Sequence, residues 1–118
     1  MKEFYFERLK VWEESREMVE IIYKVTSQFP KEEKYALTSQ IRRATTSISA
    51  NIAEGMTRQS DKSKARFINI AFGSAIEVIN FLILARDLKY PTNNDYTKLR
   101  SKTEKITNQL NALYNRLK

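Results

Sequence analysis

The chain has 118 residues, with 21 Lys and Arg against 14 Asp and Glu, which gives a formal net charge of +7. It contains no Cys and no His, which excludes disulfide scaffolds, thiolate zinc sites, cysteine nucleophiles and every acid–base mechanism that uses histidine. Only two Gly and two Pro interrupt it, so we expect a single domain over residues 1–118 built from a few long helices.

The N-terminal residues, Met1 to Tyr5, carry charges and lack a following apolar stretch with a cleavage site. We therefore expect no signal peptide and a cytoplasmic protein. Segment 67–85 is apolar enough to raise the question of a membrane span, but its Asn69, Glu77 and Asn80 would be costly in lipid. A buried helix explains this segment better than a membrane helix.

The first two helices follow from apolar residues at steps of three and four. One helix is predicted from about Arg8 to Gln28, and Pro30 ends it. A second is predicted from about Glu32 to Glu54, because acidic residues favour a helix N-terminus. Gly55 stands where a left-handed C-cap is expected. The apolar stripe of the second helix comprises Leu37, Ile41, Ala44, Thr45, Ile48 and Ile52.

Two further helices complete the chain. The third is predicted from a cap at Ser60-Asp61 to about Lys89, before the Tyr90-Pro91 break. The fourth begins with Thr92 as its cap and Asp95 three residues on. Its seam has a heptad spacing with one polar member: Tyr96, Leu99, Thr103, Ile106, Leu110, Leu113 and Leu117. Short connections make neighbouring helices antiparallel, so we expect an all-α, up-down-up-down four-helix bundle.

The third helix is apolar nearly all round, whereas one helix of a monomeric bundle needs only one apolar stripe. One stripe comprises Ile68, Ala71, Phe72, Ala75, Ile79, Leu82 and Ala85, and a second comprises Phe67, Ile70, Val78, Phe81, Leu84 and Leu88. We expect a homo-oligomer with the second and third helices at the interface, because large exposed apolar patches mark interaction sites. The alternative is that small residues such as Gly73 merely fit a tight bundle.

Glu77 lies within this apolar helix, where a buried unpaired carboxylate would be expensive. Arg42, Arg43 or Arg66 is its expected partner. We expect Glu77 to form an ion pair that fixes the register of the helices, and not to act as a catalytic acid. The residues expected to serve structure or assembly are Arg42, Arg43, Glu54, Gly73, Glu77, Phe81 and Leu84.

Positive charge is concentrated in two segments. Residues 31–66 hold eight basic and four acidic residues, and residues 92–118 hold six basic and two acidic residues. The candidate nucleic-acid-binding residues are Arg58, Lys62, Lys64 and Arg66 at one junction, and Lys98, Lys102 and Lys105 in a helical stripe. Clustered cations of this kind are typical of phosphate-backbone binding, although a charged stripe is commonly only a solvated helix face. No motif for base-specific recognition is present.

The sequence contains no arrangement typical of catalysis. Without His there is no di-iron bundle motif, and no Gly-rich phosphate loop or nucleophile motif is found. We therefore expect no enzyme, no catalytic residue, no bound metal and no cofactor.

Several motifs occur in the order typical of one family. They are Leu9-x-Val11-Trp12, Ile22-Tyr23, Phe29-Pro30, Glu33-x-Tyr35-x-Leu37, Ser39-Gln40-x-Arg42-Arg43, Ser47-Ile48, Asn51-Ile52-Ala53-Glu54-Gly55 with Arg58, Phe67 and Ala71-x-Gly73-Ser74-x-x-Glu77. Over about residues 8–90 the chain resembles the four-helix-bundle proteins encoded in 23S rRNA intervening sequences. It departs from their pattern mildly, at Ala36 and at Ala44-Thr45-Thr46.

The resemblance implies a four-helix bundle that assembles as a pentameric ring. It also implies kinship to the accessory variability protein of diversity-generating retroelements, which binds nucleic acid and a reverse transcriptase through a basic barrel. Two hypotheses remain open. The chain is an oligomeric adaptor that binds RNA or DNA backbone beside a protein partner such as a reverse transcriptase, or it is a structural, protein-interaction module without nucleic acid.

Overall fold

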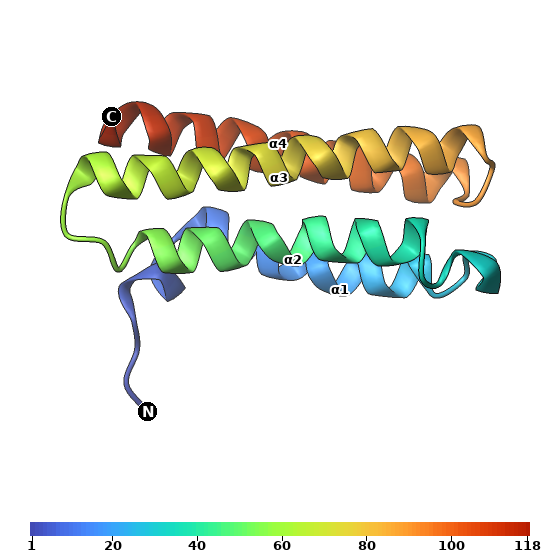
Figure 1. The fold of residues 1–118 in the computed structure, drawn as a ribbon, viewed down its shortest axis with the longest axis horizontal. Helices are drawn as coiled ribbons and strands as arrows, with labels where there is room; N and C mark the ends of the chain where they lie inside the picture. Colours follow the sequence, from blue (N-terminus) through green and yellow to red (C-terminus); the bar gives the residue numbers. More distant parts are fainter.

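The computed structural model describes residues 1–118 and contains four long helices and no strands. The helices are α1 (Lys10–Thr26), α2 (Leu37–Gly55), α3 (Asp61–Asp87) and α4 (Asn93–Leu117). Short 3-10 helices precede two of them, η1 (Tyr5–Arg8) before α1 and η2 (Lys31–Glu33) before α2. Successive helices run antiparallel, so the predicted up-down-up-down bundle is confirmed (Figure 1).

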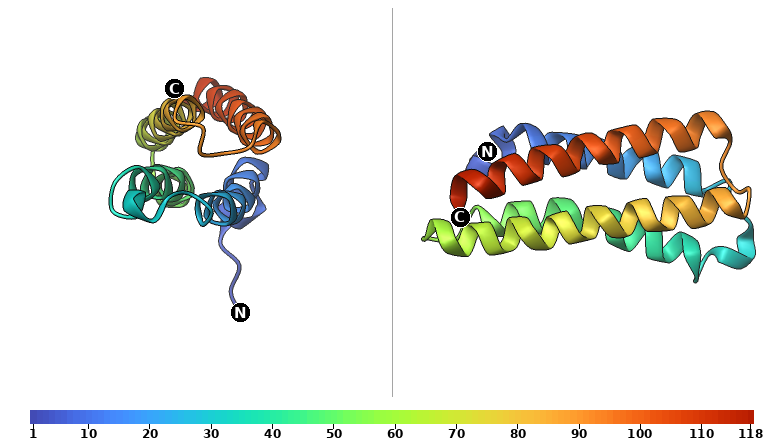
Figure 2. Two further views of the ribbon diagram at one scale, coloured as in Figure 1. Left: turned by 90° about the vertical axis from the view of Figure 1, so that its right-hand side faces the viewer. Right: turned by 90° about the horizontal axis from the view of Figure 1, so that it is seen from above.

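The four helices occupy the corners of a square when the bundle is seen end on (Figure 2). α1 packs against α2 and α4, and α3 packs against the same two helices, so α1 and α3 are diagonal partners. The bundle measures 43 × 31 × 22 Å. Each helix therefore has two neighbours, one inward face and one outward face.

The core is a single cluster of 19 buried apolar residues to which all four helices contribute. The predicted seam of the last helix is confirmed by the burial of Leu99, Ile106, Leu110 and Leu113. The first helix and its C-terminal end contribute Val11, Met18, Ile22, Val25 and Phe29 to the same core. Thr103, the polar member of the heptad seam, is fully buried, and its hydroxyl donates to the carbonyl oxygen of Leu99 at 2.7 Å. A satisfied hydroxyl explains how the seam accommodates a polar residue.

Both predicted N-caps are present. The Ser60 hydroxyl accepts from the Ser63 amide at 3.1 Å at the start of α3, and the Thr92 hydroxyl accepts from the Asp95 amide at 3.0 Å at the start of α4. Each bond satisfies one of the amides that a helix N-terminus leaves without a partner. The capping residues Ser60 and Thr92 therefore determine where α3 and α4 begin.

The start of α2 differs from the prediction. The helix begins at Leu37 and not at Glu32, because Ala36 has φ −122° and ψ −107°, outside the helical region. The Glu33 carboxylate accepts from the Leu37 amide at 3.2 Å and from the Tyr90 hydroxyl at 2.7 Å. Glu33 thus joins the start of α2 to the α3–α4 loop across the end of the bundle.

Gly55 is not a left-handed cap. No Gly has a positive φ, and Gly55 is the last residue of α2. A Cβ there would lie 2.7 Å from the Cβ of Phe67, so Gly55 is required for the close approach of α2 and α3. The left-handed residue is instead Lys89, with φ 63°, which ends α3 and lets the Tyr90 amide donate to the Ala85 carbonyl oxygen at 3.0 Å.

By length and composition alone, α3 could cross a membrane. In the bundle, Ile68, Ala71, Ala75 and Leu82 are buried in the shared core. Val78, which the sequence places on the second stripe, is also fully buried. Packing against α2 and α4 thus accounts for the inward face of α3 and leaves only its outward face to be explained.

Candidate functional site

Arg58 follows the end of α2, in the predicted basic junction, and is held by two contacts. Its guanidinium donates to the Glu54 carboxylate at 2.6 Å and lies 4.6 Å from the centre of the Phe67 ring. Both charged side chains are exposed, so the pair contributes little to stability. The arrangement leaves Arg58 at the surface with its charge partly balanced, and it gives Glu54 a local partner.

Lys62 and Arg66 lie in the first turns of α3 and have no carboxylate partner. They line an open hollow of about 440 Å³ between the start of α3 and the end of α4. The other lining residues are Ala65, Asn69, Tyr114 and Lys118. No acidic side chain lines this hollow, so its electrostatic character is positive.

Lys118 joins this cluster, although no motif in the sequence marks it. The antiparallel arrangement brings the end of α4 beside the start of α3, and no local sequence signal reports that proximity. Lys64, the remaining member of the predicted junction, is half-buried on α3 and forms no ion pair. The structure thus gathers cations from two segments that are remote in the sequence.

The predicted lysine stripe of α4 faces α1. Lys105 Nζ lies 2.9 Å from Glu14, while Lys102 Nζ lies 3.5 Å from Glu14 and 3.4 Å from Glu17. The Glu14 side chain is only 8% exposed, so its carboxylate needs these partners. The hydrogen bond from Lys105 lowers the pKa of Glu14 against the opposing effect of burial, and the same bond raises the pKa of Lys105. Lys102 and Lys105 therefore have a structural role, the pairing with α1, which their spacing on α4 does not indicate.

We expect Glu14→Gln to lower the free energy of unfolding at pH 7 by about 1–3 kcal/mol, because it removes charged hydrogen bonds from a buried position. The folded-state pKa of Glu14 is lowered, so its stabilisation is complete above the ordinary Glu pKa of about 4.3 and is lost as pH falls through the folded value. Urea unfolding over a pH series measures this effect, and the wild type and the variant should converge in acid.

Glu17→Gln is the matched control, because Glu17 shares Lys102 but its side chain is half exposed. It should change the free energy of unfolding by less than about 1 kcal/mol. Equal losses for Glu14→Gln and Glu17→Gln, or a gap between wild type and Glu14→Gln that stays constant down to about pH 3, would contradict the assignment.

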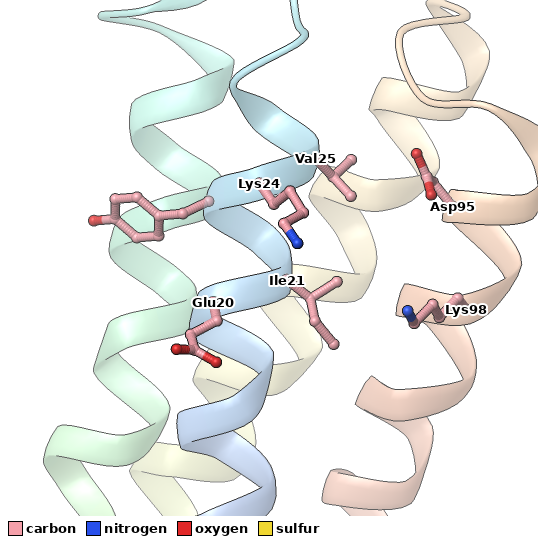
Figure 3. A pocket seen from close by; sticks show the side chains of 7 residues that line it. Glu20, Ile21, Lys24, Val25, Asp95 and Lys98 are labelled. Carbon is pink, nitrogen blue, oxygen red and sulfur yellow. The ribbon is translucent and has the colours of Figure 1, made fainter.

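Lys98 borders a separate hollow of about 540 Å³ between the end of α1 and the start of α4. Figure 3 shows Lys98 and Asp95 projecting from α4, with Glu20 and Lys24 on α1. Two acidic and two basic side chains balance one another here. This hollow therefore lacks the net positive charge of the hollow beside Lys62.

The prediction for Glu77 is wrong. Glu77 is exposed on the outward face of α3 and has no ion-pair partner. Arg42 faces α1 instead, where it donates to Thr26 Oγ1 at 2.9 Å and to the Tyr23 carbonyl oxygen at 3.3 Å. The apolar sequence around Glu77 predicts burial, but Glu77 lies on the side of α3 that faces away from both α2 and α4.

An apolar surface surrounds Glu77 on the outward face of α3, and we call it the α3 face. It comprises Ile70, Gly73, Phe81, Leu84 and Leu88. Leu84 is 45% exposed and Leu88 53% exposed, whereas Phe81 is half-buried. A Cβ at Gly73 would meet nothing within 4 Å, so the bundle itself does not require a glycine there. Arg43 is exposed on α2.

Asn51 and Ser47 of the Asn-Ile-Ala-Glu-Gly and Ser-Ile motifs have structural roles. Ser47 Oγ and Ser74 Oγ lie 2.9 Å apart and join α2 to α3, and Asn51 donates to the Ser47 carbonyl oxygen at 2.8 Å. No group of three acidic side chains is close enough to hold a metal ion.

Comparisons with known proteins place these features in context. The sequence model described as 23S rRNA-intervening sequence protein matches residues 7–112. A crystal structure of a protein of unknown function from the S23 ribosomal protein family of Bacteroides thetaiotaomicron is 28% identical, with a TM-score of 0.80. The similarity covers 88% of this chain and 97% of that one. A comparison with curated proteins finds no match.

Proposed function

Because the chain belongs to the 23S rRNA-intervening sequence protein family, we propose that it is a non-enzymatic, cytoplasmic protein that binds the backbone of RNA or DNA. The observation that carries this proposal is the hollow lined by Lys62, Arg66 and Lys118, which has no acidic side chain in its lining. Unpaired cations gathered from two helices suit a row of phosphates, and no feature suits recognition of particular bases.

We also propose that the protein works as a homo-oligomer, in the pentameric ring that the family resemblance implies. The exposed α3 face supports this, because contiguous apolar surface on a soluble protein marks a contact with another chain. A ring would repeat the Lys62–Arg66 cluster on every subunit and so multiply its field. In such a ring the protein would act as an adaptor between nucleic acid and a protein partner such as a reverse transcriptase.

The salt dependence of binding tests the nucleic-acid proposal. We expect the logarithm of affinity to fall linearly with the logarithm of salt concentration, with a slope of about 0.7–0.9 for each phosphate neutralised. The double change Lys62→Gln/Arg66→Gln should flatten that slope by about 1.4–1.8 for each bound subunit, since it removes two phosphate contacts. Fluorescence anisotropy with labelled RNA and DNA measures both quantities.

Lys2→Gln/Lys10→Gln is the matched control. It removes the same charge from the N-terminal segment and from α1, the helix diagonal to α3. An equal change in slope for both double variants would show that net charge, and not the hollow at Lys62 and Arg66, determines the salt dependence of binding. Absence of measurable affinity at about 50 mM salt would instead favour a protein-interaction module without nucleic acid.

A further inference from the structure

The α1–α2 connection and the start of α3 lie at opposite ends of the bundle (Figure 1), and two exposed tyrosines belong to the end that holds this connection. Tyr35, in the α1–α2 connection, is 87% exposed, and Tyr23, near the end of α1, is 43% exposed. Neither ring belongs to the core or to the partly buried apolar residues packed against it. Packing within the bundle therefore does not explain why aromatic residues stand at these positions.

Cations accompany both rings. The guanidinium carbon of Arg42 lies 4.3 Å from the centre of the Tyr23 ring, and Lys34 Nζ lies 5.4 Å from that of Tyr35. The rings border a hollow of about 350 Å³ that has no acidic lining residue. Its lining consists of Tyr23, Lys34, Tyr35, Ser39, Arg42, Arg43 and Thr46, which we call the tyrosine surface.

The cations of the tyrosine surface carry unbalanced charge. Lys34, Arg42 and Arg43 form no ion pair, in contrast to Lys102 and Lys105 on α4. The hydrogen bonds of Arg42 to Thr26 Oγ1 and to the Tyr23 carbonyl oxygen hold its guanidinium in place without neutralising it. A fixed, unpaired guanidinium beside an aromatic ring is prepared for a phosphate, because little rotamer freedom remains to be lost on binding.

A second, smaller hollow of about 170 Å³ adjoins this surface and shares Lys34 and Arg42 with it. Lys31 and Thr38 also line it. The Thr38 hydroxyl is buried and has no hydrogen-bond partner, whereas the Leu37 amide at the start of α2 already donates to the Glu33 carboxylate. The lysine and the arginine that the two hollows share therefore extend the cationic lining toward this buried hydroxyl.

We propose that the tyrosine surface binds single-stranded nucleic acid, with bases stacked on Tyr35 and Tyr23 and phosphates held by Lys34, Arg42 and Arg43. Proteins that bind single strands combine a cationic groove with exposed aromatic rings, because every base has a face that can stack. A duplex keeps its base faces covered and cannot use the rings. The inference rests on the proposed function in one respect, because both take nucleic acid as the ligand. The tyrosine surface and the hollow at Lys62 and Arg66 lie at opposite ends of the bundle, so each can be tested separately.

Tyr35→Ala tests the inference with two probes, a labelled single-stranded RNA of about 12 nucleotides and a duplex of the same sequence, at about 50 mM salt. Fluorescence anisotropy should show single-strand affinity weakened by about 5-fold to 150-fold, which corresponds to one lost stacked base, with duplex affinity unchanged. Tyr35→Phe is the matched control, because it keeps the ring and should keep the affinity. The ring makes no core contact, so both variants should melt like the wild type.

The outcomes separate this inference from the proposed function. Unchanged single-strand affinity in Tyr35→Ala, together with weaker binding of both probes by Lys62→Gln/Arg66→Gln, would overturn the tyrosine surface and leave the proposed function standing. Equal losses on single strand and duplex would overturn base stacking. A changed oligomeric mass in Tyr35→Ala with unchanged affinity would assign the surface to protein contact. Absence of binding to either probe by the wild type would overturn both proposals.

Discussion

Gly55→Ala is expected to lower the free energy of unfolding by about 2 kcal/mol. The added methyl group would lie 2.7 Å from the Cβ of Phe67 and 3.6 Å from the carbonyl oxygen of Lys64. Because the nearest atom is a Cβ, no rotation of the Phe67 side chain can relieve the clash, and α2 and α3 must move apart. For a domain of this size the melting temperature should fall by on the order of 8 °C.

Gly73→Ala provides the matched control on α3. A Cβ at Gly73 would meet nothing within 4 Å, and Ala is favoured over Gly inside a helix by up to about 1 kcal/mol. This variant should therefore melt above the wild type when the comparison is made on dissociated subunits. Thermal and urea unfolding followed by circular dichroism would distinguish the two glycines. A stabilised Gly55→Ala protein would show that α2 and α3 do not approach as closely as described.

The helices could be predicted from the sequence because their signals are local. Apolar spacing, Pro30 and Pro91, and the caps at Ser60 and Thr92 each act within one or two turns of the chain. The errors fall where a distant segment decides the outcome. The Glu33 carboxylate at the start of α2 also bonds Tyr90 of the α3–α4 loop, and the reason for Gly55 lies on a different helix, at Phe67.

The candidate sites could be predicted only in part, for the same physical reason. Clusters of charged residues can be seen in a sequence, but the residues that pair with them cannot. Glu14 forms ion pairs with Lys102 and Lys105, which lie far from it along the chain. Lys118 joins Lys62 only through the antiparallel path of α4. Tyr35 belongs to a sequence motif, yet its exposure depends on the three-dimensional path of the α1–α2 connection.

Leu84→Glu is expected to convert the proposed oligomer into a 13.9 kDa monomer that remains fully helical. Leu84 is 45% exposed on the α3 face of an isolated subunit, so a carboxylate there costs the bundle itself little. At a subunit interface, the same carboxylate would be buried against an apolar partner surface, at a cost of about 2–7 kcal/mol per contact. Sedimentation velocity at micromolar concentration measures the mass, and circular dichroism measures the helix content.

Two controls separate interface burial from the mere addition of charge. Leu84→Met keeps an apolar side chain of similar volume and should leave the oligomer intact. Ala112→Glu adds the same charge at an exposed position of α4, away from the α3 face, and should also leave it intact. A monomeric wild type would refute the assembly outright, and an oligomer that survives Leu84→Glu would place its interface on another face. If only Leu84→Glu dissociates the protein, the excess apolar surface of α3 is explained by contact between identical subunits.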